Sequence, residues 1–459
     1  MPGERPHLIF LMADQLRADV LGPYAGPYAH CPTPNLDRLA ASATVFERHL
    51  TPSPLCVPAR SSIMTGREPS GHGAQINGSG DGAGPGNRLR ADLPLLPGHL
   101  ASSGYDVVHY GVQHVHSDPP LELAAGVECR HPRRLSLEDV GLETRAFKAP
   151  CLSHSTGGDR LFWYSNAATA AWPGPADAFF DMALTDQIVR RIQGHDPGRP
   201  LALFGMYWAP HPPFVVPEPW WSRFNAEALR LPPTVGRWCP GQSLVHLAHL
   251  PGEIGAGVPR EHWPRVWAAY LGLVAMVDHC LGRVLDALQL RGMLEDALVV
   301  FTADHGEMLG CHNLLQKMCM YDEAVRVPLV VRFPGQTQPG RVGVLTTHLD
   351  LAPTLCAAAE APALPDAEGL VLSADGPAER RPVLFSEYHG NGVPEAEQWM
   401  ACSETYKLID TGPWGVELYD LRADSAEAHN LAGDAAHRPT LEALQGALRA
   451  HRRRSSSGA

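Results

Sequence analysis

Apolar runs that end in polar residues recur along the chain, and they constrain its fold more than any other feature. Five such runs stand out, at 7–13, 105–111, 201–208, 297–307 and 327–333. Uninterrupted runs of this length are typical of strands buried on both faces of a sheet. Helical periodicity lies between them, at 35–43 (with Asn35 as the expected N-cap), 177–193 and 263–290. The alternation predicts an α/β fold with a largely parallel sheet covered by helices on both faces.

The pattern changes after about residue 360. Four short strand-like segments follow one another without intervening helices, namely PVLFSEY, WMACSET, YKLID and ELYDL. They predict a small antiparallel subdomain, followed by a helix at 439–452. We place a large domain at 1–375 and a C-terminal subdomain at 376–459, whose basic tail RRRSSSGA we expect to be disordered.

Composition and charge narrow the partners and the location. The chain has 459 residues, of which 44% are hydrophobic and 19% charged, as in ordinary globular proteins. A formal net charge of -12 argues against a nucleic-acid or anionic-membrane partner. The first apolar run is short, and no small-residue cleavage site follows it. Since no uninterrupted apolar stretch is long enough to cross a bilayer, we expect a cytoplasmic protein.

The ten cysteines are scattered singly, and none forms a CxxC pair. This spacing predicts neither a disulfide framework nor a structural zinc site. We expect most of them to be small buried side chains.

Cys56 differs from the others because of the segment CVPARSSIMTGR that it opens. The segment predicts a helix that starts near Pro58 and is capped by Gly66. A thiol at the amino end of a helix lies in a positive backbone field, to which Arg60 adds. We therefore expect a lowered pKa for Cys56 and an affinity for anions.

The same segment resembles the modification motif of the sulfatase family, C-x-P-S/A-R followed by x-x-x-L/M-T-G-R. Every fixed position is filled here, by Cys56, Pro58, Ala59, Arg60, Met64, Thr65, Gly66 and Arg67. The resemblance implies that a formylglycine-generating enzyme oxidises Cys56 to formylglycine, whose hydrate is the nucleophile. One hydroxyl of the hydrate attacks, and the other then loses its proton to expel the product. The other interpretation is a structural cysteine at a helix start.

The resemblance covers most of the chain, from the first strand through PTPNLDRLA and TADHGE to ELYDL. It implies an alkaline-phosphatase-like α/β/α sandwich with a mostly parallel central sheet. A smaller C-terminal α+β subdomain with antiparallel strands completes this fold.

Two strand ends offer metal ligands. Asp14 and Gln15 follow the first apolar run, and Asp304 and His305 follow the run that begins at 297. The carboxyl ends of parallel strands converge on one edge of a sheet, so the two pairs can meet. The family resemblance implies one divalent metal ion held by these four residues and Cys56, with calcium favoured and manganese or magnesium as alternatives. Read without the resemblance, each Asp is a helix cap or turn residue.

Gln15 departs from the family pattern, because sulfatases commonly have a second Asp at this position. The substitution removes one negative charge and makes the ligand set less hard.

Two further residues match family elements on the leaving-group side. His211 in WAPHPPF resembles the HxPF element, whose histidine faces the substrate and can donate a proton near neutral pH. Lys317 in LLQKMCMYDEAVRVP matches the lysine beside the bridging sulfate oxygen. The resemblance implies that both residues stabilise or protonate the leaving group.

The nucleophile side has three candidates. His114 in YGVQHVHSD matches the family's G-K-x-H element and inherits the role of base for the second diol proton, with His116 as a competitor. Val112 stands where the family has its lysine. Arg60 would hold the oxygen of the nucleophile, and Asn77 would hydrogen-bond a substrate oxygen unless it is only a turn residue.

The implied reaction is hydrolysis of a sulfate monoester, from a small molecule or a saccharide, to an alcohol and sulfate. Three alternatives remain: a phosphonate monoester or phosphodiester hydrolase of the same fold, an N-sulfatase (sulfamidase-like), and a non-catalytic anion-binding homologue. The alcohol pocket would come from the loop 77–87 and the aromatic segment 162–172, with Trp220 and Trp221. Core packing is the other interpretation of these aromatic residues.

Overall fold

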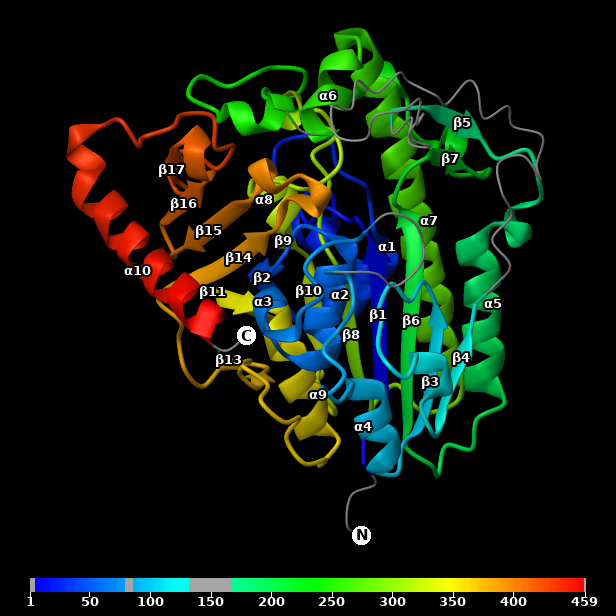
Figure 1. Ribbon diagram of the computed structural model, residues 1–459. Coiled ribbons are helices and arrows are strands. Elements are labelled where there is room, and N and C mark those ends of the chain that lie inside the picture. The colour runs from blue at the N-terminus through cyan, green and yellow to red at the C-terminus, as the bar shows by residue number, and fades with distance from the viewer. Residues whose placement is uncertain (1–4, 79–85, 132–166, 249, 458–459) are drawn as a thin grey trace.

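The computed structural model describes residues 5–78, 86–131, 167–248 and 250–457 (Figure 1). Nine strands of these described residues form the central sheet. Eight of them follow one path, in the order β11 (Gly340–Thr347), β2 (Thr44–Leu50), β10 (Leu329–Arg332), β8 (Leu298–Ala303), β1 (Leu8–Asp14), β6 (Leu201–Pro210), β3 (Asp106–Gly111) and β4 (Val127–Arg130). The ninth, β9 (Arg326–Val327), pairs with β2.

The sheet is mainly parallel, as the sequence predicts. Strand β1 pairs in parallel with β6 and β8, whereas β10 runs antiparallel to both of its neighbours. In the register of β1 and β8, Ala13 lies opposite Ala303. Asp14 and Asp304, the next residues, therefore leave the sheet at the same level of one edge.

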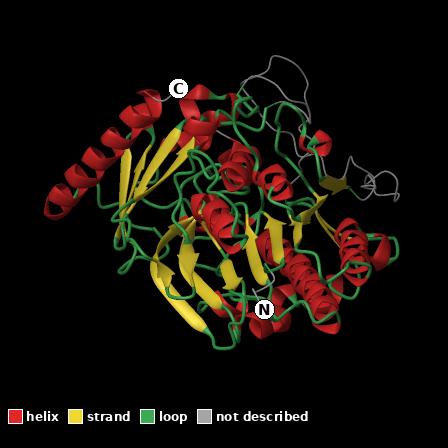
Figure 2. Cartoon of the chain, turned by 90° about the horizontal axis from the view of Figure 1, so that it is seen from below, coloured by secondary structure: helices red, strands yellow, loops and turns green. Residues whose placement is uncertain are grey.

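Alternate side chains of β1 enter two separate cores, because successive residues of a strand point to opposite faces. Ile9 and Leu11 belong to one core and Leu8, Phe10 and Met12 to the other. The first core is covered by α1 (Pro34–Ala40), α5 (Phe180–Gln193) and α7 (Trp263–Leu290). The second is covered by α2 (Cys56–Thr65), α4 (Leu96–Ser102) and α9 (Leu351–Ala358). Helices lie on both faces of the sheet, which confirms the predicted layers (Figure 2).

Helix α7 is long and apolar enough to cross a membrane by length and composition alone. In the structure, 83% of the most apolar 18-residue stretch of this helix is buried inside the protein. It is thus packed as a core helix against β6 and α5.

The predicted N-cap at Asn35 is wrong. Helix α1 begins at Pro34, and Thr33 is its N-cap. The carboxylate of Asp278 accepts hydrogen bonds from the backbone N–H groups of Asn35 (3.2 Å) and Leu36 (2.8 Å). A residue of α7 therefore caps this helix in place of the local side chain.

The C-terminal strands form a separate antiparallel sheet, as expected. Its strands are β14 (Leu384–Tyr388), β15 (Gln398–Cys402), β16 (Tyr406–Asp410) and β17 (Val416–Asp420). Helix α10 (Arg438–Ser457) lies along this sheet (Figure 1). The predicted boundary at 375/376 falls in the short hairpin β12 (Leu372–Ser373) and β13 (Gly376–Pro377), and it stays a prediction.

The expectation of a disordered basic tail is wrong for residues 452–457, because α10 continues to Ser457, and residues 458–459 lie outside the described residues. Arg452 lies 3.7 Å from the carboxylates of both Glu397 and Asp410. Its guanidinium also stacks over the ring of Trp399, 4.8 Å from the centroid. These contacts hold the basic end of the helix on the sheet.

The remaining elements of this part of the chain are short. They are α3 (Pro69–His72), α6 (Leu250–Gly257), α8 (Asp322–Val325) and a two-stranded pair of β5 (Thr169–Ala171) with β7 (Phe214–Val216).

Candidate active site

Helix α2 places Cys56 at the sheet edge. The helix begins at Cys56, two residues before the expected start, and ends at Gly66, whose φ of 68° confirms the predicted glycine cap. Cys56 is only 2% exposed. Burial and the charge of Asp14 raise the pKa of the Cys56 thiol to about 12, against the opposing effect of Lys317. The expected lowering of this pKa is therefore wrong, and an unmodified thiol here is a poor nucleophile at neutral pH.

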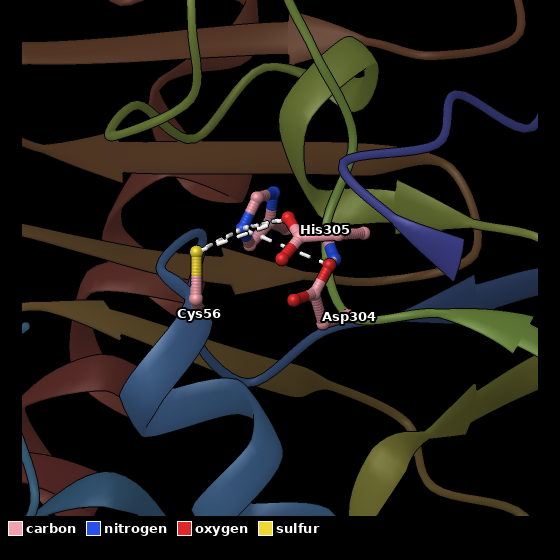
Figure 3. Close-up of side chains that lie close together, drawn as sticks. Cys56, Asp304 and His305 are labelled. Carbon is pink, nitrogen blue, oxygen red and sulfur yellow. Dashed lines mark hydrogen bonds and ion pairs between the residues drawn. The ribbon is translucent and has the colours of Figure 1, made fainter. Parts of the chain in front are cut away.

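Four potential metal ligands come together at this point (Figure 3). Cys56 Sγ lies 3.1 Å from His305 Nε2 and 4.0 Å from Asp14 Oδ1. His305 Nε2 lies 3.9 Å from Asp14 Oδ1 and 3.7 Å from Asp304 Oδ1. The donor atoms all lie within 4.8 Å of one another, and all four residues are buried. The structure thus brings together residues that the sequence separates by almost 300 positions.

The orientation of each donor suits a divalent cation. His305 Nδ1 lies 3.1 Å from the carbonyl oxygen of Gly306, which places the proton on Nδ1 and leaves the Nε2 lone pair toward the carboxylates. Arg60 occupies only the outer oxygen of each carboxylate, at 2.9 Å from Asp14 Oδ2 and 2.8 Å from Asp304 Oδ2. The Oδ1 atoms and His305 Nε2 therefore face one another, as metal ligands must.

Gln15 adjoins this group through its amide. Its backbone N–H donates to Asp304 Oδ1 at 3.0 Å, in a left-handed conformation with φ of 64°. Its side-chain Nε2 donates to the carboxylate of Glu307, and its Oε1 accepts from Lys317. The amide oxygen is thereby turned away from Glu307, while its role as a metal ligand stays a prediction.

Lys317 and His211 form the predicted pair on one side of the site. Lys317 Nζ lies 3.1 Å from His211 Nε2, and both side chains are buried. His211 Nδ1 lies 2.6 Å from the carbonyl oxygen of Pro212, so its proton is on Nδ1 and Nε2 accepts. Although burial opposes the charge, Cys56, Asp14 and Asp304 raise the pKa of Lys317. The proton shared by this pair therefore resides on Lys317.

The His114 segment lies next to Arg60. The Arg60 guanidinium donates to the carbonyl oxygen of Val112 at 2.7 Å, so the backbone at the position of the missing lysine contacts Arg60. His114 has a left-handed φ of 45° and packs edge-on against Trp208, with ring centroids 6.1 Å apart. Burial and Arg60 lower the pKa of His114 to about 3. The imidazole is therefore neutral at physiological pH, and the same shift makes it a weaker base than a free histidine.

Asn77 lies beside the nucleophile, but its side-chain oxygen is used within the protein. Its Oδ1 accepts a hydrogen bond from the backbone N–H of Val57, at 2.9 Å. This contact caps the first turn of α2, next to Cys56. The predicted contact of Asn77 with a substrate oxygen stays a prediction, one that only its amide nitrogen can meet as a donor.

The proposed alcohol pocket is only partly visible. Within the loop 77–87, residues 79–85 lie outside the described residues, as do the first five residues of the segment 162–172. Trp172 is 8% exposed and Trp220 is 6% exposed, and each packs in a hydrophobic core. Trp221 is partly buried against the same core as Trp220. For these tryptophans the packing interpretation holds.

Two buried residues of the site have no counterpart among the sequence predictions. Glu307 closes the TADHGE motif, and its place three residues after Asp304 was the available signal. His348 Nε2 lies 2.9 Å from the backbone oxygen of Asp304, and its Nδ1 lies 2.9 Å from His49 Nε2. No local pattern marks His348, because its contact depends on the tertiary fold.

A second group of possible ligands, Glu68, Glu387 and His451, lies where α10 meets the start of α3. Glu387 there already accepts from Ser70 Oγ at 3.0 Å and pairs with His389 Nε2 at 2.7 Å. His451 of α10 lies 3.3 Å from the carboxylate of Glu68, so this group belongs to the contact between α10 and the large domain.

Comparison with known proteins gives this geometry a family. The Sulfatase family model matches residues 6–361, and the model "N-sulphoglucosamine sulphohydrolase, C-terminal" matches residues 310–454. Since the first match covers well over half of the chain, the protein belongs to the sulfatase family.

Individual relatives of this chain are both sulfatases and enzymes of wider activity. The multifunctional alkaline phosphatase superfamily protein PehA of Trinickia caryophylli is 28% identical, over 94% of this chain and 92% of its own. The choline-sulfatase of Rhizobium meliloti is also 28% identical, over 93% and 82%. Among solved structures, the phosphonate monoester hydrolase of Agrobacterium radiobacter superposes with a TM-score of 0.79 at 25% identity, covering 98% of this chain and 96% of that one. These relatives support a hydrolase, and the predicted alkaline-phosphatase-like fold is confirmed.

Proposed function

We propose that the protein is a sulfuric ester hydrolase that cleaves a sulfate monoester to an alcohol and sulfate. Its nucleophile is a formylglycine hydrate derived from Cys56. One observation carries the proposal: Cys56 Sγ lies 3.1 Å from His305 Nε2, inside a buried group of ligands that includes Asp14 and Asp304. The nucleophile position thus lies within the group of residues that would hold the metal ion.

A divalent cation held by Asp14, Asp304 and His305, with Gln15 as a further ligand, would lower the pKa of the diol and neutralise the anionic group. We favour calcium because two carboxylates and an amide supply oxygen donors. Manganese and magnesium are the alternatives, manganese because His305 adds a nitrogen.

The chain's own residues supply the rest of the chemistry. Arg60 holds the two carboxylates in place and keeps positive charge beside the nucleophile. His114 takes the proton of the second diol hydroxyl, since its imidazole is neutral. Lys317, which is hydrogen-bonded to His211, stabilises the negative charge on the departing oxygen or donates a proton to it.

A second candidate function is hydrolysis of phosphonate monoesters or phosphodiesters. It is favoured by the likeness to phosphonate monoester hydrolases of Agrobacterium radiobacter and Silicibacter pomeroyi, each at 25% identity over 98% of this chain. Both reactions need the same in-line attack and the same cationic clamp.

Two remaining alternatives have less support. The N-sulphoglucosamine sulphohydrolase likeness covers residues 310–454, which include Lys317 but neither Cys56 nor either metal pair, so it favours an N-sulfatase only weakly. A non-catalytic homologue would need no such convergence of nucleophile, ligands and leaving-group cation. We further propose a cytoplasmic enzyme that acts on a small-molecule or saccharide ester and meets a formylglycine-generating enzyme during maturation.

The test has two parts. The protein is coexpressed with a competent generating enzyme, and the Cys56 peptide is weighed, because conversion of the thiol to the aldehyde removes about 18 Da. The same preparation is then assayed on nitrophenyl sulfate and on a nitrophenyl phosphonate monoester, with Cys56→Ala as the control. Higher kcat/KM on the sulfate, absent in the control, supports the first proposal. A higher value on the phosphonate favours the second, and an unmodified peptide without turnover contradicts both.

A further inference from the structure

The backbone on both sides of Lys317 is held in an unusual conformation. Gln316 has φ of 77° and Met318 has φ of 71°, so left-handed non-glycine residues flank Lys317 directly. Such residues are uncommon, and they persist only where surrounding contacts fix them. The contacts that fix these two residues therefore decide where the Lys317 side chain points.

Before Lys317, the contact is with Glu307. Its carboxylate Oε1 accepts from the backbone N–H of Gln316 at 2.6 Å and from that of Leu309 at 3.1 Å. Its Oε2 accepts from the side-chain amide of Gln15. Glu307 is fully buried, so one carboxylate orients both a metal-site amide and the loop that carries Lys317.

After Lys317, the contacts come from two other parts of the chain. The backbone N–H of Met318 donates to the carbonyl oxygen of Pro54 at 3.2 Å, two residues before Cys56. Gln398, the first residue of β15, donates from Nε2 to the carbonyl oxygen of Met318 at 3.1 Å. Gln398 is also fully buried, so the C-terminal sheet reaches the loop of Lys317 through it.

We propose that Glu307 and Gln398 are positioning residues for the leaving-group side of the reaction. Glu307 orients the Gln15 amide and the backbone before Lys317, and Gln398 fixes the backbone after it. This rests on the proposed function in one respect, namely that Lys317 assists the departing oxygen. The two residues differ in that only Glu307 also touches a metal-site residue.

Because only Glu307 touches a metal-site residue, metal affinity distinguishes the two residues. Glu307→Gln puts an amide N–H against groups that themselves donate, so calorimetric affinity for Ca²⁺ and Mn²⁺ should fall about 10- to 100-fold, as for other residues that orient ligands. Gln398→Leu should leave that affinity unchanged, because the Gln398 side chain donates to the carbonyl oxygens of Met318 and Ala396 and to no residue of the metal site. Unchanged affinity in a folded E307Q protein overturns the role of Glu307. If E307Q does not fold, Glu307→Asp replaces it, with an intermediate loss expected.

The second readout is kcat/KM over a series of aryl esters with increasing leaving-group pKa. Loss of leaving-group assistance steepens this dependence, and K317A sets the limit, with a loss of about 100-fold or more at the poorest leaving group. Q398L and E307Q should lie between wild type and K317A. Thr411→Val, another buried polar residue of the C-terminal subdomain, is the matched control and should keep the wild-type slope. A wild-type slope in Q398L overturns its positioning role.

The two readouts separate failure of this inference from failure of the proposed function. Calorimetry needs no turnover, so it tests Glu307 even if the wild-type protein hydrolyses none of the esters. If the protein prefers phosphonate esters, the same slopes are measured on that series.

Discussion

Two lysines of this protein are equally buried and have opposite surroundings. Lys407 Nζ lies 2.8 Å from the carboxylate of Glu427 and also contacts the carboxylate of Asp322. Lys317 Nζ instead meets Gln15 Oε1 and His211 Nε2, and none of the ion pairs between described residues includes it. Lys407 is thus paired directly with carboxylates, whereas the carboxylates of Asp14 and Asp304 raise the pKa of Lys317 without a direct ion pair. Burial alone therefore does not distinguish the two groups, but direct pairing of the cation does.

The same contrast holds for the carboxylates. Asp322 and Glu427 pair directly with Lys407, and Glu427 also accepts a hydrogen bond from the backbone N–H of Asp322 at 2.6 Å. Asp14 and Asp304 give one oxygen each to Arg60 and turn the other toward His305. Matched substitutions in the two groups can test this contrast.

The largest expected difference is between two buried cysteines. Cys56→Ala should reduce kcat/KM by at least about 10⁴-fold, because the nucleophile is lost. Cys402→Ala, close to Lys407, should retain activity within a few-fold. Aryl ester hydrolysis of both proteins, after confirmation of folding by circular dichroism, measures this. Comparable loss in C402A would mean that the active site extends into the C-terminal sheet.

Next in size are the two aspartates. Asp304→Asn should lower divalent-cation affinity by more than about 100-fold and nearly abolish turnover, because an ionised ligand is lost. Chelation of the wild-type protein should have the same effect on turnover, reversed by added metal. Asp322→Asn should leave metal stoichiometry at the wild-type value and reduce stability instead. Metal content and denaturant unfolding of both variants distinguish these effects, and metal loss in D322N would contradict the comparison.

The lysines themselves come third. Lys407→Met leaves the buried carboxylate of Glu427 and the partly buried one of Asp322 without their cation, and breaking such a group costs about 3–5 kcal/mol of unfolding free energy. Lys317→Met should cost less stability, or even gain some, since no ion pair to a described carboxylate is broken. Its effect should appear in kcat, by about 100-fold. Urea unfolding and steady-state kinetics of the two variants measure these effects. Equal losses of unfolding free energy in the two variants would contradict the prediction.

The smallest effect concerns the pH dependence of stability at His389, which directly follows β14. Although burial opposes the charge, hydrogen bonds to Glu387 and Glu397 raise the pKa of His389 to about 9. A raised histidine pKa adds stability that is fully present below about pH 6.5 and is lost as pH rises through about 9. His389→Gln should therefore lower the Tm by a few degrees at pH 6 and much less at pH 10.

The control for this last variant is His429→Gln, because the side chain of His429 is 80% exposed. Thermal unfolding of the three proteins between pH 6 and 10 measures the effect. A Tm difference between wild type and H389Q that is independent of pH would show that His389 stabilises by packing alone.

The sheet edge and its residues could be predicted because their signals are local. An apolar run marks each buried strand, and parallel strands bring their carboxyl ends together, so Asp14 and Asp304 meet without knowledge of any contact. The motif that begins at Cys56 specifies its helix in the same way, down to the glycine that ends it.

What could not be predicted depends on residues distant in sequence. The cap on α1 comes from Asp278, whose carboxylate accepts a hydrogen bond from the backbone N–H of Leu36, 242 positions away in the sequence. The pKa of Cys56 follows from burial and from Asp14, which outweigh the helix field that sequence reasoning considered. The order of the basic tail depends on carboxylates and a tryptophan of another element. A sequence pattern indicates the secondary structure that a residue favours, whereas these features depend on residues of other elements that contact it in the folded protein.

The burial of α2 also dictates when the proposed enzyme can be made active. All ten residues of Cys56–Thr65 are buried in the folded protein, so a maturation enzyme cannot bind this segment once folding is complete. The oxidation that we propose would therefore have to compete with folding after synthesis of the segment. On this proposal, a molecule that folds first would keep its thiol. The active fraction of a preparation would then depend on the rate of oxidation relative to the rate of folding. Slower synthesis or a more abundant maturation enzyme would raise this fraction.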